Sequence, residues 1–246
     1  MKIMVINPNS SVTMTEHLGK VLNQIKNSGT ELSVVCPKGG PQAIESAYDE
    51  ALCVPGVLKL VEKANTEGYD AIIIACFSDP GLEACREISN ILVTGIEEIG
   101  LHVAAMMGAK FTILTMNRER VPAKEKEGRR YKLEHSMASV RPLGMSVAET
   151  DSEPDRARER IRSLAKQAAE EDGAEVIVLG CAGMAGYAEG ITEELGITVI
   201  DPSSVALKVT EALVAANVSH AKCAFYAIPP SIRRAAENNK DCSLCG

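Results

Sequence analysis

Short, uninterrupted apolar runs alternate with helical segments along almost the whole chain. The runs at 71–75 and 176–180 contain only branched and small apolar residues, which is typical of strands buried on both faces of a parallel sheet. Further strands are predicted at 2–6, 32–36, 91–94, 111–115, 139–143 and 196–200, with helices that include 49–68, 96–107, 118–134, 154–171 and 203–216. Because helices follow strands throughout, we expect an α/β fold with mainly parallel sheets, right-handed crossovers and helices on both faces.

The order of strands and helices is repeated in the two halves of the chain, which look like copies of one plan. A chain of 246 residues can bury one large core or two small ones. We therefore predict two pseudosymmetric α/β domains with the active site in the cleft between them. The first domain is expected to comprise 1–97 together with about 205–225, and the second 98–204, because the last helix is expected to return to the first sheet. Residues 226–246 are predicted to form a flexible tail.

The composition argues against several classes of function. A formal net charge of −7 gives no reason to expect binding to nucleic acid or to an anionic membrane. No apolar run approaches the roughly 18 residues that span a bilayer, and no signal sequence is recognised, so a cytoplasmic protein is expected. There its eight cysteines should be reduced, including Cys242 and Cys245 near the C-terminus. The histidines are scattered and no phosphate-loop motif occurs, so neither a metal nor another cofactor is expected.

Cys76 and Cys181 hold equivalent positions, because each directly follows a predicted buried strand. Parallel strands bring their carboxyl ends to the edge of the sheet where α/β proteins bind ligands. Two thiols that face each other across a substrate could remove a proton from one face and supply one to the other, which is racemase chemistry. An ordinary thiol is only about 3% ionised at pH 7, and the N-terminus of a following helix would lower its pKa. A single cysteine at such a place is more often a small core residue, so the catalytic interpretation depends on the pair.

Other predicted strand ends carry groups that could stabilise the negative charge formed when a proton is removed. The candidates are the side chains of Asn9, Ser10, Ser78 and Thr115 and the amides that follow the two cysteines, at Phe77 and Ala182. Simpler interpretations remain open. Residues 7–10 could form only a turn with a helix cap, and Tyr48 could merely lie at the start of a helix.

Two further patterns predict local structure. Asp79-Pro80 and Asp201-Pro202 each combine a capping residue with a proline suited to the first position of a helix. Each pair is therefore expected to start a helix. The charged stretch 118–130 is expected to form a helix face exposed to solvent.

The chain also carries four motifs in the order found in one known family. They read Val-Ile-Asn-Pro-Asn-Ser at 5–10, Tyr-Asp-Glu-Ala at 48–51, Ile-Ala-Cys-Phe-Ser-Asp-Pro-Gly-Leu at 74–82 and Ile-Val-Leu-Gly-Cys-Ala-Gly-Met at 177–184. Together they resemble the hydantoin racemases of the cofactor-independent aspartate/glutamate racemase superfamily, which have the allantoin racemases as near relatives. The resemblance extends from residue 2 to about residue 215.

The resemblance implies a two-domain fold with the substrate between the domains. It implies that Cys76 and Cys181 are the acid and base thiols, one on each face of the reacting carbon. It places Asn9, Ser10, Ser78, Thr115 and Gly183 against the ring carbonyls and amides. It places Tyr48 near the ring substituent. Many relatives have a second threonine where this chain has Met116, a departure that bears on the preferred substituent.

The leading hypothesis is a cofactor-independent racemase of 5-substituted hydantoins, with allantoin as a close variant. A neutral cyclic ureide fits because no basic residue is adjacent in sequence to Asn9, Cys76 or Cys181. The alternatives are an aspartate/glutamate-type amino-acid racemase and a non-catalytic small-molecule binder of the same fold. A homo-oligomer is expected because most soluble oligomers assemble from identical chains.

Overall fold

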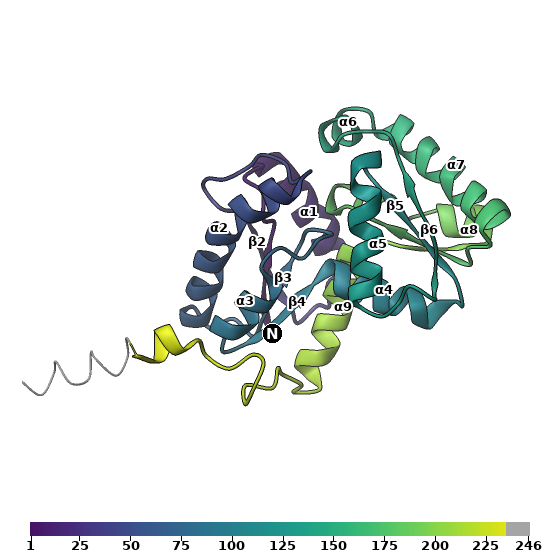
Figure 1. Cartoon of the computed structure of the whole chain (residues 1–246). Coiled ribbons are helices and arrows are strands. Elements are labelled where there is room, and N and C mark those ends of the chain that lie inside the picture. Colours follow the sequence, from purple (N-terminus) through teal and green to yellow (C-terminus); the bar gives the residue numbers. More distant parts are fainter. Residues whose placement is uncertain (235–246) are drawn as a thin grey trace, which may run out of the picture.

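The strands form two separate sheets in a computed structural model that describes residues 1–234 (Figure 1). The first sheet has the order β2-β1-β3-β4 and contains β1 (Lys2–Ile6), β2 (Glu31–Val35), β3 (Ala71–Ile74) and β4 (Leu92–Gly95). The second has the order β6-β5-β7-β8 and contains β5 (Phe111–Thr115), β6 (Met137–Pro142), β7 (Val176–Leu179) and β8 (Thr198–Ile200). All neighbouring strands are parallel, and both halves use the same strand order. The predicted α/β fold with two similar domains is confirmed.

Helices flank both sheets. Those of the first half are α1 (Val12–Ile25), α2 (Ala47–Thr66), α3 (Leu82–Ile88) and α4 (Ile96–Met107). The second half contains the short turn η1 (Arg118–Arg120), α5 (Val121–Arg130), α6 (Val147–Ser152), α7 (Pro154–Asp172), the short turn η2 (Ala182–Met184), α8 (Ile191–Leu195) and α9 (Pro202–Ala215). The sequence did not predict α6 and α8, because helices of six and five residues are too short to show an apolar period. The predicted helix 118–134 is shorter, and its first turn is η1.

Alternate residues of each strand point to opposite faces of the sheet and enter different cores. In the first sheet, Met4 and Ile72 pack with residues of α2 and α3. The residues whose side chains point to the other face of this sheet, such as Val5 and Ile73, belong to a core that also contains Phe111 and other residues of the second sheet. This shared core joins the two domains through apolar contacts. The outer face of the second sheet has its own core against α7.

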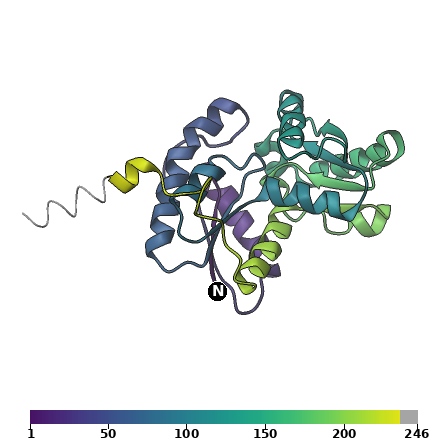
Figure 2. The same cartoon turned by 60° about the horizontal axis from the view of Figure 1, so that its bottom comes forward.

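Two helices at the domain junction cross over from one half of the chain to the other sheet. Helix α4 follows the first sheet but contacts β7 and β8 of the second, whereas α9 follows the second sheet and contacts β3, β4 and α1 of the first. The two helices also pack against each other at the junction, where Figures 1 and 2 show α9 in yellow-green. Gly100 of α4 permits this approach, because a Cβ there would lie 2.9 Å from the Cβ of Pro202. This exchange of α4 and α9 holds the two halves of the chain in contact.

The two aspartate–proline pairs have different roles. Asp201 caps α9 by accepting hydrogen bonds from the amides of Ser203 and Ser204, at 2.9 and 3.4 Å, as predicted. The prediction for Asp79 is wrong, because α3 begins only at Leu82. Asp79 has a positive φ of 43° and turns its carboxylate to the start of α4.

At the start of α4, the Asp79 carboxylate accepts hydrogen bonds from the amides of Glu97 and Glu98, at 3.1 and 2.8 Å. The residue before α4 is Gly95, whose missing side chain leaves space for this carboxylate. A tertiary contact therefore replaces the local cap.

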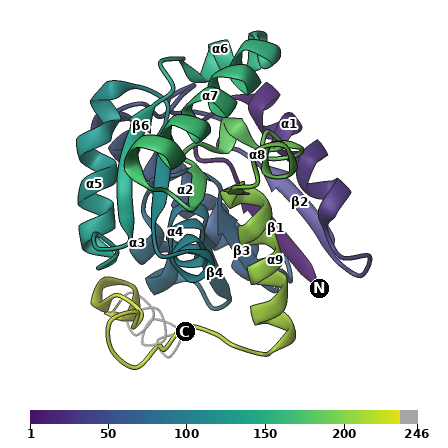
Figure 3. The same cartoon turned by 90° about the vertical axis from the view of Figure 1, so that its right-hand side faces the viewer.

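The segment after α9 runs back along the first domain, past β4 to α3 (Figure 3). The Lys222 ammonium donates to the carbonyls of Arg86, Glu87 and Ser89 at the end of α3, at 2.6 to 2.9 Å. Tyr226, the first residue of the predicted tail, accepts a hydrogen bond of 3.1 Å from Arg86. The prediction of a flexible tail otherwise concerns mainly residues 235–246. These residues, which include Cys242 and Cys245, lie outside the described part of the chain. Across residues 1–234, no helix has the length and apolar character needed to cross a membrane.

Candidate functional site

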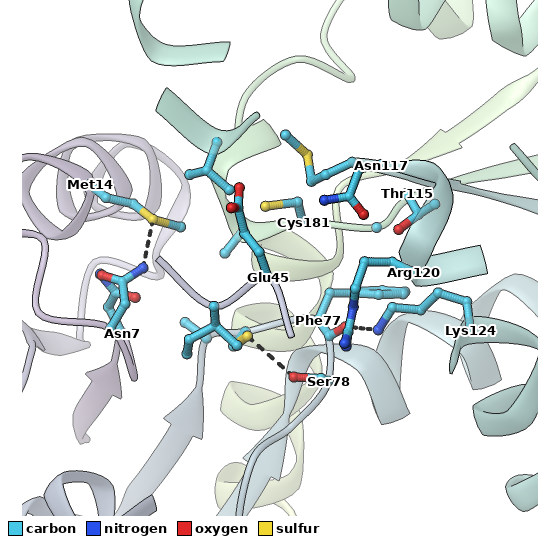
Figure 4. Close-up of a pocket in the computed structure, with 18 residues that line it drawn as sticks. Asn7, Met14, Glu45, Phe77, Ser78, Thr115, Asn117, Arg120, Lys124 and Cys181 are labelled. Atoms are coloured by element: carbon cyan, nitrogen blue, oxygen red, sulfur yellow. Dashed lines mark hydrogen bonds between the residues drawn. The ribbon is translucent and has the colours of Figure 1, made fainter. Parts of the chain in front are cut away.

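Cys76 and Cys181 lie at the carboxyl ends of equivalent strands, β3 and β7, and line one pocket between the domains (Figure 4). Each of these strands occupies the third place in its four-stranded sheet. Of the predicted site residues, the pocket brings together Asn9, Cys76, Phe77, Ser78, Thr115, Cys181 and Ala182. Parallel pairing explains this, because it brings the ends of β1, β3, β5 and β7 to facing edges of the two sheets.

Three predicted substrate-binding residues lie outside this lining. The Ser10 hydroxyl donates to the carbonyls of Gly40 and Pro41, at 3.1 Å each, and thereby fixes the loop before α2. Tyr48, in the first turn of α2, is 71% exposed. Gly183 donates its backbone amide to the sulfur of Cys181, at 3.3 Å. Their predicted contacts with substrate remain predictions.

The Cys76 thiol is a weaker acid than an ordinary cysteine. Burial raises the pKa of Cys76 to about 12, and the nearby Cys181 also raises it. The Ser78 hydroxyl, 3.5 Å from the sulfur, and the Lys124 ammonium act in the opposite direction. The expected acidification by a following helix is therefore outweighed by burial. Once formed, such a thiolate is a strong base.

An amide network fixes Asn9 within the site. Asn7 donates through Nδ2 to Oδ1 of Asn9 at 2.8 Å and to the hydroxyl of Thr15 at 2.9 Å. The Nδ2 group of Asn9 then points to the sulfur of Met14, at 3.1 Å. Oδ1 of Asn7 is left buried, with no hydrogen-bond partner among the described residues. The same holds for Oδ1 of Asn117, which also belongs to the pocket lining.

Asn7 and Asn117 were not predicted as site residues. Both follow strand ends in the sequence, so the signal that identified Asn9 and Ser78 was also available for them.

Charged residues also line the pocket, and the sequence did not predict them. The prediction that 118–130 forms a solvated face is wrong for Lys124, which is 2% exposed. Its ammonium donates to the carboxylate of Glu97 at 2.6 Å and to the carbonyl oxygen of Phe77. Arg120 forms an ion pair with Glu50 of α2. These partners are distant in sequence, so periodicity along one helix does not reveal them.

Glu45 is a further charged residue of the pocket lining. Its side chain projects into the pocket from the loop that precedes α2 (Figure 4). Within residues 1–234 this carboxylate has no ion pair or side-chain hydrogen bond. Unlike Arg120 and Lys124, it therefore brings an unneutralised charge to the site.

The raised pKa of Cys76 predicts a particular pH dependence for its alkylation. Because only the thiolate reacts, the rate with neutral iodoacetamide should rise about tenfold per pH unit from about pH 7 to 10. An ordinary thiol would level off near its pKa of about 8.5. Mass spectrometry of the Cys76 peptide would measure the rate, with free glutathione as the control. A plateau at or below about pH 9 would contradict the raised pKa.

The fold and the site define a two-domain α/β protein with paired cysteines at one pocket. A sequence model of the family described as Asp/Glu/Hydantoin racemase matches residues 3–210. The hydantoin racemase of Pseudomonas sp. (strain NS671) is 38% identical over 93% of this chain and 92% of its own length. Among solved structures, the allantoin racemase from Klebsiella pneumoniae has 37% identity and a TM-score of 0.90, covering 93% of this chain and 94% of its own. The allantoin racemase from Pseudomonas fluorescens has 33% identity and a TM-score of 0.89, covering 94% and 97% respectively.

The chain belongs to the Asp/Glu/Hydantoin racemase family. It is accordingly an enzyme of the isomerase class, a racemase.

Proposed function

We propose that the protein is a cofactor-independent racemase of 5-substituted hydantoins, with allantoin as a close variant. The observation that carries this proposal is the presence of two cysteines at equivalent strand ends in one pocket. The likeness to hydantoin and allantoin racemases supports the substrate class.

In the proposed mechanism, one cysteine thiolate removes the proton from the ring carbon that bears the substituent. The electron pair of the broken C–H bond moves onto the adjacent carbonyl oxygen and forms an enolate. The thiol of the other cysteine then protonates the same carbon from the opposite face, which inverts it. The first cysteine ends as a thiol and the second as a thiolate, and a solvent proton exchange restores the starting state.

Hydrogen-bond donors near the two cysteines would stabilise the enolate oxygen. The candidates on the pocket wall are the Asn9 amide and the hydroxyls of Ser78 and Thr115. Asn9 is suited to this role because Asn7 and the amide of Ser11 hold its oxygen, and its Nδ2 group has a second N–H besides the one that contacts the Met14 sulfur. A donor fixed before the reaction lowers the barrier without reorganisation.

The test is proton NMR of single-enantiomer allantoin and 5-benzylhydantoin in deuterated buffer with a reductant. We expect enzyme-dependent loss of the α-proton signal, accompanied by loss of optical rotation. Exchange no faster than the no-enzyme control with both compounds would reject the proposal. Exchange of free aspartate or glutamate instead would identify an amino-acid racemase.

The amino-acid alternative is less well supported by the pocket. A dicarboxylate substrate needs unpaired cations to hold its charges. Arg120 and Lys124 line the pocket, but they are already paired with Glu50 and Glu97. A binder without catalysis would have no use for two thiols in one pocket.

The unpaired charge of Glu45 predicts a preference among ring substituents. A carboxylate in a partly desolvated pocket repels an anionic substituent by about 1 to 2 kcal/mol. Glu45→Gln should therefore raise kcat/KM for 5-(2-carboxyethyl)hydantoin about tenfold relative to 5-benzylhydantoin. Glu62→Gln, at an exposed position of α2, is the matched control and should leave the ratio unchanged. An unchanged ratio in Glu45→Gln would show that the carboxylate does not face the substituent.

A further inference from the structure

Lys124 connects the two domains at the wall of the site. It belongs to α5 of the second half, but its ammonium binds the carbonyl oxygen of Phe77, the residue after Cys76 in the first half. Its other partner is the Glu97 carboxylate at the start of α4, at 2.6 Å. Both side chains are almost fully buried, with 3% of Lys124 and none of Glu97 exposed. An ammonium so enclosed has a fixed position.

The buried carboxylates near Lys124 differ in how fully their oxygens are hydrogen-bonded. Oδ1 and Oδ2 of Asp79 are held by the first amides of α4, but Oε2 of Glu97 is buried with no partner among the described residues. Burial raises the pKa of both Asp79 and Glu97, and Lys124 opposes this for Glu97. The titratable groups that act on Cys76 are Lys124, Cys181 and Cys53, and those that act on Glu97 include Lys124, Glu50 and Glu127. Lys124 is thus the cation shared by the Cys76 thiol and the buried Glu97 carboxylate.

We propose that Lys124 is a positioning residue for Cys76, which fixes the backbone after the thiol and stabilises the Cys76 thiolate whenever it forms. The Phe77 carbonyl is the point of attachment, because it lies in the peptide between Phe77 and Ser78, and Ser78 is the hydroxyl partner of the Cys76 sulfur. The electrostatic influence of Lys124 on Cys76 opposes the effect of burial. The inference deepens the proposed function, but its test on the thiol does not require racemase activity.

The experiment compares a variant that loses only the charge of Lys124 with a variant that loses the charges of both Lys124 and Glu97. Lys124→Met leaves the buried Glu97 unpaired, so it could destabilise the fold as well as affect the thiol. The double variant Lys124→Met with Glu97→Gln removes both charges and should regain much of the lost melting temperature. Lys126→Met, at an exposed position of the same helix, removes the same formal charge and is the matched control.

The readout is the alkylation rate of Cys76 by iodoacetamide at about pH 8, resolved by peptide mass spectrometry. The exposed Cys223 provides the internal reference. We expect the rate at Cys76 to fall about tenfold in both the single and the double variant, with no change in Lys126→Met. In the racemase assay, the rising limb of the pH profile of kcat/KM should move to higher pH.

A wild-type alkylation rate in the double variant would overturn the proposal, because Lys124 would then serve only to neutralise Glu97. An equal effect of Lys126→Met would also overturn it, since the effect would then come from the net charge of the protein and not from the position of Lys124. If the wild-type protein fails to racemise hydantoins but the alkylation result holds, the proposed function is rejected while the role of Lys124 stands.

Discussion

Replacing Cys76 or Cys181 by serine should lower kcat/KM for racemisation at least about 1,000-fold. Both residues line the pocket from opposite domains, and a two-base reaction needs one group on each face of the carbon. A serine hydroxyl is too weak an acid to take the place of either thiol. Cys36→Ser is the matched control, because Cys36 also directly follows a strand, β2, but does not line the pocket. It should keep wild-type activity.

The single variants allow a sharper test than loss of activity alone. The remaining cysteine can still remove the α-proton from the enantiomer that faces it, so each variant should exchange deuterium into one enantiomer without inverting it. Cys76→Ser and Cys181→Ser should show opposite preferences. Full exchange of both enantiomers in the double variant would exclude the thiols as the acid and base.

Gly95→Ala should destabilise the protein by about 3 kcal/mol. Gly95 precedes α4, and a methyl group there would overlap the carboxyl group of Asp79. The carboxylate would have to leave the amides of Glu97 and Glu98, which would then be buried without a partner. Gly29→Ala is the control, since a Cβ at Gly29 meets nothing within 4 Å. Urea denaturation would measure both changes.

A double variant separates the steric clash from the loss of the cap. Asp79→Ala removes the cap and should itself destabilise the protein. Adding Gly95→Ala to Asp79→Ala should then cost little, because the group that the methyl would overlap is gone. Strictly additive effects of the two substitutions would show that the carboxylate is not the obstacle at Gly95.

The predicted fold came from signals that are local in sequence. Apolar runs such as 71–75 carry their own strand pattern, and the alternation with helices determines parallel pairing in each half. The same logic placed Cys76 and Cys181 at the ends of equivalent strands, and the structure brings them to one pocket. Helices α6 and α8 were missed because their signal is too short.

The errors at Asp79 and Lys124 have a common physical origin. Asp79-Pro80 has the local chemistry of a helix start, yet the Asp79 carboxylate caps α4, which begins seventeen positions later, beside a glycine that leaves space for the carboxylate. Lys124 lies in a charged helix, which by itself predicts exposure, but Phe77 and Glu97 provide a buried acceptor pair. In both cases the partner comes from another element.

The sequence by itself determined the parallel strand–helix plan, its duplication and the strand-end positions of the two thiols, because periodicity and residue type act over a few neighbouring positions. Only the tertiary structure decided how the halves meet. It packed α4, which follows the first sheet, against the second, turned Lys124 and Glu45 to the pocket and placed Cys76 where desolvation raises its pKa. These properties depend on contacts and desolvation among residues far apart in the chain, which no local pattern encodes.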